Sequence, residues 1–141
     1  MRRSTRFSVM AIVAIVGAIV FGACNNTTPV TPTTTPAPTT TDTFTGTLTP
    51  NSARIFPFTV QAVGTLTAAL TTVTPDSTIA VGLDLGTWNG TACQIIIANA
   101  NVVQGGVVTG TAGGSGTLCV RIYDVGNLTA NEDFVVTVLH P

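Results

Sequence analysis

Lysine is absent from this chain of 141 residues, and charged side chains of all kinds make up only 8% of it. Three of the five arginines, Arg2, Arg3 and Arg6, lie at the start, which leaves Arg54 and Arg121 for the remainder. Nucleic-acid binding needs clustered basic side chains that neutralise phosphates. The shortage of cations therefore disfavours a nucleic-acid partner.

Side chains that exchange protons are equally scarce. The chain has a single histidine, His140, and its six acidic residues include no pair at a spacing that predicts a glycosidase dyad. Because His140 is the penultimate residue, we expect a solvated imidazole without a nucleophile beside it. The sequence predicts a non-catalytic protein that needs no cofactor.

Asn131, Glu132 and Asp133 form a small oxygen-rich turn. Calcium takes six to eight oxygen ligands, and the chain contains no Asp-x-Asp-x-Asp-Gly pattern. We expect a solvated turn and no metal site, with a calcium loop as the alternative.

The N-terminus has the three parts of an export signal. A basic stretch is followed by an apolar run over residues 9–20 and then by the small residues Gly22 and Ala23. The uncharged stretch over residues 7–23 has 17 residues, the lower limit for a helix that crosses a bilayer. We predict a cleaved signal peptide over residues 1–23, with an uncleaved helical anchor as one alternative.

The stretch Phe21-Gly22-Ala23-Cys24 resembles the lipobox of bacterial lipoproteins, although Phe21 stands where that family prefers leucine. The resemblance implies cleavage before Cys24, fatty acids on its thiol, and a protein anchored to a membrane of the bacterial cell envelope. Two or three acyl chains anchor a protein firmly, whereas one chain binds only marginally. An ordinary secreted protein without lipid is the other alternative.

Residues 25–41 read NNTTPVTPTTTPAPTTT, with nine threonines, four prolines and no charge. Such a segment buries too little apolar surface to offset the entropy of ordering, and its prolines favour extended conformations. With Cys24, these residues form a predicted disordered linker over residues 24–41. An O-glycosylated stalk is the alternative.

From Asp42 to the C-terminus, apolar residues recur at every second position between turn signals, which is typical of short strands. The expected strands cover residues 42–48, 56–60, 64–71, 79–85, 93–98, 103–111, 118–123 and 133–139. Pro57 favours an edge strand, whereas the continuous apolar run 93–98 indicates a buried one. About eight short strands and no helix predict an all-β domain over residues 42–141, a two-sheet antiparallel β-sandwich.

With Cys24 assigned to lipid, Cys93 and Cys119 remain as a pair in an oxidising compartment. Both fall in expected strands, so we predict a disulfide, with two free buried thiols as the alternative.

Five segments resemble the bacterial pre-peptidase C-terminal domain, a β-sandwich of about this length. They are FPFTV at 56–60, GTL at 64–66, the strand at 79–85, SGTLCVRIYD at 115–124 and the closing strand at 133–138. The resemblance implies a non-catalytic exported module, in a family linked to secretion, surface attachment or substrate binding. Leu118 replaces the family's usual aromatic residue, and no protease domain precedes the module in this sequence.

Trp88, Asn89 and Tyr123 are the candidate ligand-binding residues, because an exposed tryptophan in a Gly-bounded loop stacks well on a sugar ring. The alternative is that Trp88 caps the core beside the disulfide, as tryptophan does in immunoglobulin domains. Arg121 is expected to form a surface charge pair with Asp124.

Two functions follow. The first is a lipid-anchored envelope protein whose domain faces the periplasm or the exterior and binds an exported protein. The alternative is a carbohydrate- or cell-wall-binding module that uses Trp88 on an envelope glycan.

Overall fold

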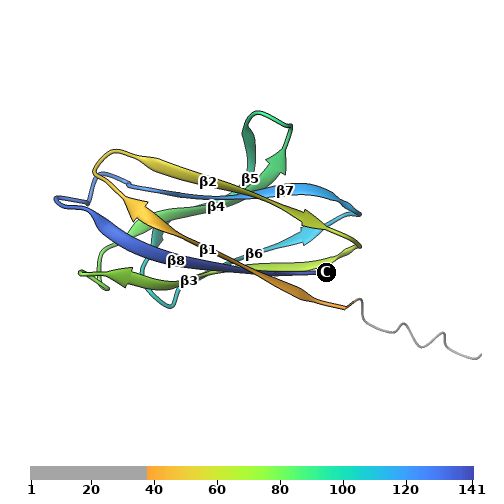
Figure 1. The fold of residues 1–141 in the computed structure, drawn as a ribbon, viewed down its shortest axis with the longest axis horizontal. Coiled ribbons are helices and arrows are strands. Elements are labelled where there is room, and N and C mark those ends of the chain that lie inside the picture. Colours follow the sequence, from red (N-terminus) through yellow and green to blue (C-terminus); the bar gives the residue numbers. More distant parts are fainter. Residues whose placement is uncertain (1–37) are drawn as a thin grey trace, which may run out of the picture. The chain divides into compact units, whose positions relative to one another are not determined.

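The computed structural model describes residues 38–141. The predicted signal peptide, the lipidation of Cys24 and the linker up to residue 37 lie outside the described residues. The described part is all-β, with eight strands in two antiparallel sheets of four that form a sandwich (Figure 1), which confirms the predicted fold class. No helix in this part is long and apolar enough to cross a membrane.

The strands follow one another along the chain with short connections. They are β1 (Thr40–Leu48), β2 (Ala53–Val60), β3 (Gly64–Thr74), β4 (Val81–Trp88), β5 (Cys93–Val102), β6 (Val107–Ala112), β7 (Gly116–Tyr123) and β8 (Glu132–His140). The first sheet has the order β1-β8-β3-β6, and the second has the order β2-β7-β4-β5. The first and last strands are therefore neighbours, paired from Thr40 with His140 to Leu48 with Glu132.

Aromatic side chains join the two sheets on the side of β1 and β2. Phe44 of β1 stacks on Phe56 of β2 with 5.0 Å between ring centroids, and Phe56 meets Phe134 of β8 edge-on at 6.0 Å. Aromatic pairs at such distances add about 0.5–1.5 kcal/mol each beyond the area they bury. Leucine, valine and isoleucine side chains from both sheets fill the rest of the core.

Pro57 lies in β2, which is an edge strand of the second sheet, as the sequence predicts. Proline cannot donate a hydrogen bond to a second neighbour, so an edge position tolerates it.

The expectation of a buried strand at residues 93–98 is wrong. β5 is the other edge of the second sheet, and half-buried and exposed residues alternate along it. Ile96 is 70% exposed, the largest exposed fraction among the large apolar side chains of residues 38–141. A run of three isoleucines can occur in an edge strand as well as in a central strand. The periodicity of the sequence therefore could not distinguish an edge position from a central one.

The weak strand expected over 103–111 is a turn followed by the shorter β6. The turn docks on β3, because Gly105 donates its N–H to the Leu70 carbonyl at 2.7 Å and Leu70 donates to Gly106 at 3.0 Å. The side chain of Gln104 accepts the N–H of Val73 at 2.8 Å. These bonds lie beside the bulge between Leu70 and Thr72 and supply hydrogen-bond partners for this part of β3.

Candidate functional site

The predicted disulfide is present between Cys93 and Cys119, with 5.8 Å between the Cα atoms. Cys93 begins β5 and Cys119 lies in β7, and both strands flank β4 in the second sheet. The bond therefore passes over β4 and holds the β4–β5 hairpin against the outer face of the sheet. A bond that closes a loop of this length, 26 residues apart in sequence, contributes about 3–4 kcal/mol in the chain-entropy model.

Gly86 makes this crossing sterically possible. A Cβ at this position would lie 2.2 Å from the carbonyl oxygen of Gln94 and 3.0 Å from the Cα of Ile95. The register of the β4–β5 pair also shifts between Leu85 and Gly86. The bulge bends the hairpin and the missing side chain lets its backbone approach, which brings Cys93 toward Cys119.

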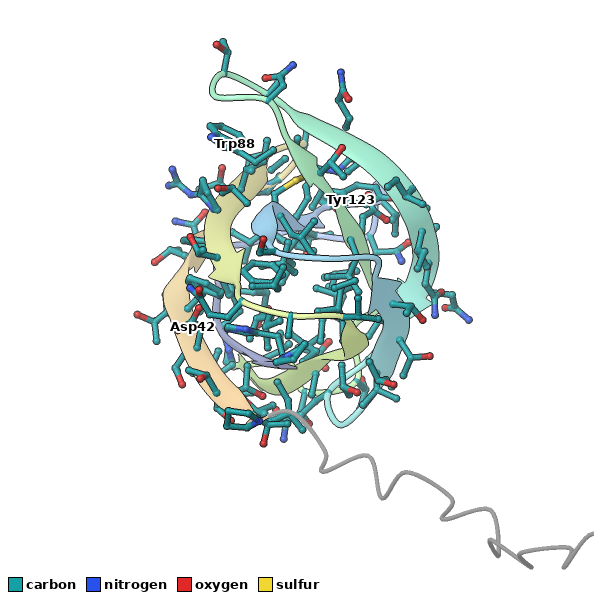
Figure 2. The ribbon with its side chains drawn as sticks, turned by 90° about the vertical axis from the view of Figure 1, so that its right-hand side faces the viewer. Asp42, Trp88 and Tyr123 are labelled. Carbon is teal, nitrogen blue, oxygen red and sulfur yellow. A yellow bond between two sulfur atoms is a disulfide. The ribbon has the colours of Figure 1, made fainter. Side chains whose placement is uncertain are left out.

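Trp88 pairs with Cys93 across the hairpin and is half-buried beside the disulfide. Asn89 follows at the turn, where its Oδ1 accepts the N–H groups of Thr91 at 2.9 Å and Ala92 at 2.8 Å. The Asn89 carboxamide oxygen is therefore used within its own turn. Trp88 retains some exposed surface close to the point where the hairpin projects from the body (Figures 1 and 2).

Tyr123 does not join Trp88 in one platform. Its partner on β4 is Gly82, six positions before Trp88 on that strand, and at about 3.3 Å per residue this separates them by roughly 20 Å. Figure 2 shows the two labelled residues apart. The Tyr123 ring lies over Gly82, where a Cβ would come within 2.1 Å of its Cζ, and the Arg121 guanidinium lies 4.5 Å from the ring centroid.

The expected pair of Arg121 with Asp124 is wrong, because Arg121 pairs with Asp84. The Nε of Arg121 donates to Oδ2 of Asp84 at 2.8 Å, and its Nη2 donates to the same oxygen. The two residues are direct partners on β7 and β4, whereas Asp124 lies beyond the end of β7. Asp84 is fully buried, and its Oδ1 has no hydrogen-bond partner within residues 38–141.

Asp124 instead caps the loop that follows β7. Its Oδ1 accepts backbone N–H groups from Gly126, Asn127 and Leu128, and its Oδ2 accepts that of Asn51 at 2.8 Å. Desolvation raises the pKa of Asp124, but the four backbone donors together outweigh it and hold the pKa below its ordinary value.

The expectation of a solvated His140 is also wrong. His140 is only 3% exposed, and its ring packs on Phe58 with 5.2 Å between centroids. Its Nε2 lies 3.2 Å from Oδ2 of Asp42, the residue labelled on β1 in Figure 2. Because β8 is the neighbour of β1, the penultimate residue is covered by the first strand and by β2.

The expectation of a solvated turn at residues 131–133 is wrong for its last two residues, because Glu132 and Asp133 begin β8. Glu132 is 4% exposed and accepts the N–H of Asp76 at 3.0 Å, while Asp133 accepts the hydroxyl of Thr47 at 2.6 Å. Across residues 38–141, no group of three or more His, Cys, Asp or Glu side chains is placed to hold a metal ion.

Sequence reasoning missed a hollow between β5 and β6, here called the β5–β6 groove. It has a volume of about 320 Å³, and apolar side chains from both sheets line it, namely Leu66, Leu85, Ile96, Ile97 and Leu118. Its other wall is the loop of residues 113–115 with the start of β7, and no charged side chain takes part. The run GGSG at residues 113–116 was the one sequence feature that marked this region, but it predicts a flexible connection and not a groove.

A scan against protein-family models found no match, and a search of curated proteins found no significant relative. The resemblance to the pre-peptidase C-terminal domain and to the lipobox therefore stays a prediction. The described residues form a disulfide-bonded β-sandwich, and the β5–β6 groove is its candidate binding site.

Proposed function

We propose that this protein is a non-catalytic lipoprotein of the bacterial cell envelope. Lipid on Cys24 holds it to a membrane, and the chain between Cys24 and the start of β1 at Thr40 tethers a β-sandwich interaction domain that faces the periplasm or the exterior. The resemblance of residues 21–24 to a lipobox supports the anchor.

One observation supports the non-catalytic part of the proposal: the buried ionisable side chains of residues 38–141, Asp84, Glu132 and His140, make contacts that hold the fold. His140 contacts Asp42, Arg121 pairs with Asp84, and Glu132 caps the backbone of Asp76. Catalysis by proton transfer needs such groups free to meet a substrate. Their use as internal contacts supports a binding role.

The β5–β6 groove supports the interaction role. A hollow of about 320 Å³ is at the small end for ligand sites, and its lining is mainly apolar, with the hydroxyl residues Thr87, Thr111, Ser115 and Thr117 and no charge. Such a groove fits one aliphatic side chain of a protein partner better than a charged metabolite.

Metabolic labelling with a fatty-acid analogue tests the anchor. We expect label on the wild-type protein, no label on Cys24→Ala, and unchanged label on Asn25→Ala, a neighbouring substitution that leaves the thiol in place. A wild-type protein that is exported and carries no label contradicts the proposal.

The alternative, a glycan-binding module, is favoured by the partial exposure of Trp88 near the projecting hairpin (Figure 2). Because Trp88 is the chain's single tryptophan, its fluorescence reports this position alone. The interaction role predicts an emission spectrum unchanged across a panel of envelope glycans. Saturable quenching by one glycan, together with calorimetric binding of that glycan that is lost in Trp88→Phe while the Cys93–Cys119 bond stays intact, would establish the alternative.

A further inference from the structure

The two open sides of the sandwich differ in how their edges are protected. On one side lie β1, which carries Asp42, and β2, which carries Arg54 and Pro57. On the other side lie β5 and β6, whose 10 and 6 residues include no charge and no proline. Charge and proline on an edge strand prevent another chain from pairing with it. The side of β5 and β6 lacks these two protections.

Ile96 is the exposed apolar side chain on this side that also lines the β5–β6 groove. On β4, Leu85 pairs with Ile97 and Gly86 pairs with Ile95, so Ile96 is the extra residue of a bulge. A bulge re-aims the side chain of its extra residue. This one leaves Ile96 70% exposed at the rim of an apolar hollow.

We propose that a second copy of this chain docks on the β5 edge, with Ile96 of each copy seated in the β5–β6 groove of the other. A two-fold interface is self-complementary, so the same surface must offer both the inserted group and its pocket. A side chain at the rim of the pocket can serve both purposes if the two-fold axis passes close to that side chain. It then enters the pocket of the partner and also forms part of the wall of its own pocket. Ile96 is such a residue.

Charge is compatible with a second copy as the occupant, and it favours the β5 edge over the edges of β1 and β2 for pairing between copies. Two copies that meet through β5 bring no like charges together, because neither β5 nor the groove lining carries any. Two copies that meet through β1 and β2 would bring Asp42 and Arg54 toward their own images and would place Pro57 in the pairing edge.

The contact is small, and this limits its strength. One strand edge and one inserted side chain belong with transient interfaces that bury less than about 1,200 Å² in total. Dimerisation becomes favourable where copies are concentrated together, and in this respect the inference rests on the proposed function, since lipid anchors confine the copies to one surface.

Sedimentation velocity of the full chain, in a detergent matched in density to the solvent, tests the proposal over about 1–200 µM. We expect the wild type to shift from monomer to dimer with rising concentration. Ile96→Asp places two carboxylates near the axis and is expected to weaken the dimer by at least about tenfold. Val63→Asp is the matched control, because Val63 is 64% exposed, lies in the connection between β2 and β3 and takes no part in the lining of the β5–β6 groove, and it is expected to dimerise as the wild type does.

A wild type that stays monomeric throughout, or equal weakening by Ile96→Asp and Val63→Asp, overturns the proposal. If Ile96→Asp loses the circular-dichroism spectrum of the wild type, Ile96→Ser replaces it and is also expected to weaken the dimer. Fatty-acid labelling separates the two hypotheses: a dimer without label on Cys24 refutes only the anchor, and a labelled monomer refutes only the dimer.

Discussion

Asp84 is a buried carboxylate that depends on a single charged partner. Its carboxylate has no exposed surface, one oxygen accepts two donors from Arg121, and the other has no partner within residues 38–141. A buried ion pair adds little net stability, but removing one partner leaves an uncompensated buried charge. Arg121 is therefore needed because Asp84 is present.

Replacing Arg121 tests this dependence. We expect Arg121→Ala to lower the free energy of unfolding by about 3 kcal/mol or more, since Asp84 loses its counter-ion and both of its hydrogen bonds. Arg54→Ala removes an exposed arginine and is expected to change stability by less than about 0.5 kcal/mol. Urea unfolding of both variants measures the difference, and equal midpoints would contradict the role assigned to Arg121.

Asp124 predicts the sign of a pH effect. Its pKa is lowered in the folded protein, so its contribution to stability is complete above the ordinary aspartate pKa of about 3.9 and is lost as pH falls through the lower folded value. Asp124→Asn retains one acceptor for the loop but cannot titrate. We expect its urea midpoint to fall less than that of the wild type between about pH 5 and pH 3. A variant with the same acid slope as the wild type would show that other carboxylates carry the effect.

At the scale of the elements, the β4–β5 hairpin depends on the absence of a side chain at Gly86. A methyl group there would meet the Gln94 carbonyl oxygen at 2.2 Å, so we expect Gly86→Ala to destabilise the protein by about 1–3 kcal/mol. The variant should also make the Cys93–Cys119 bond easier to reduce, because the hairpin lies further from β7.

Gly113→Ala is the control for this substitution. A Cβ at Gly113 would meet no atom within 4 Å, and alanine reduces the freedom of the unfolded chain, so we expect a change between zero and about 1 kcal/mol of stabilisation. Thermal unfolding and thiol titration in dilute reductant measure both variants. Equal losses of stability in the two variants would mean that the close approach of the backbone at Gly86 does not contribute to stability.

The elements themselves could be predicted because strand periodicity is a local signal. Alternating residues such as Phe56, Phe58 and Val60 turn the same face to the core whatever their neighbours are, and most of the eight strands were predictable in this way. Their positions in the sheets are not a local property. For this reason the run 93–98 predicted a buried strand, although its edge position exposes Ile96.

The candidate site was less predictable, because its contacts join residues far apart in sequence. Arg121 lies 37 positions from its partner Asp84 and three from Asp124, so nearness in sequence favoured the wrong acid. His140 lies 98 positions from Asp42, and only the pairing of β1 with β8 brings them together. The disulfide was predictable by elimination, since two cysteines remained once Cys24 was assigned to lipid.

At the scale of the whole molecule, the first strand closes the sandwich over the last. All nine residues of β1 pair with β8, and Phe44 stacks on Phe56 of the opposite sheet. The proposed tether, which ends where β1 begins at Thr40, would therefore pull on an edge strand that is fixed both within its sheet and across the core. β1 nevertheless has a neighbour on one side alone, whereas β8 lies between β1 and β3.

This difference predicts the pattern of amide hydrogen exchange. Local opening can release an edge strand without exposing the core, so β1 and β2 should exchange at least about tenfold faster than β8 and β7, a difference of about 1.4 kcal/mol in opening free energy. Mass spectrometry of peptides from each strand measures the rates, and β5 is left out because dimerisation would protect it.

Arg121→Ala provides the control: it should speed exchange of β7 and β8 by lowering global stability while it changes the frayed end of β1 far less. Equal rates in all four strands would mean that the sandwich opens only as a single cooperative unit.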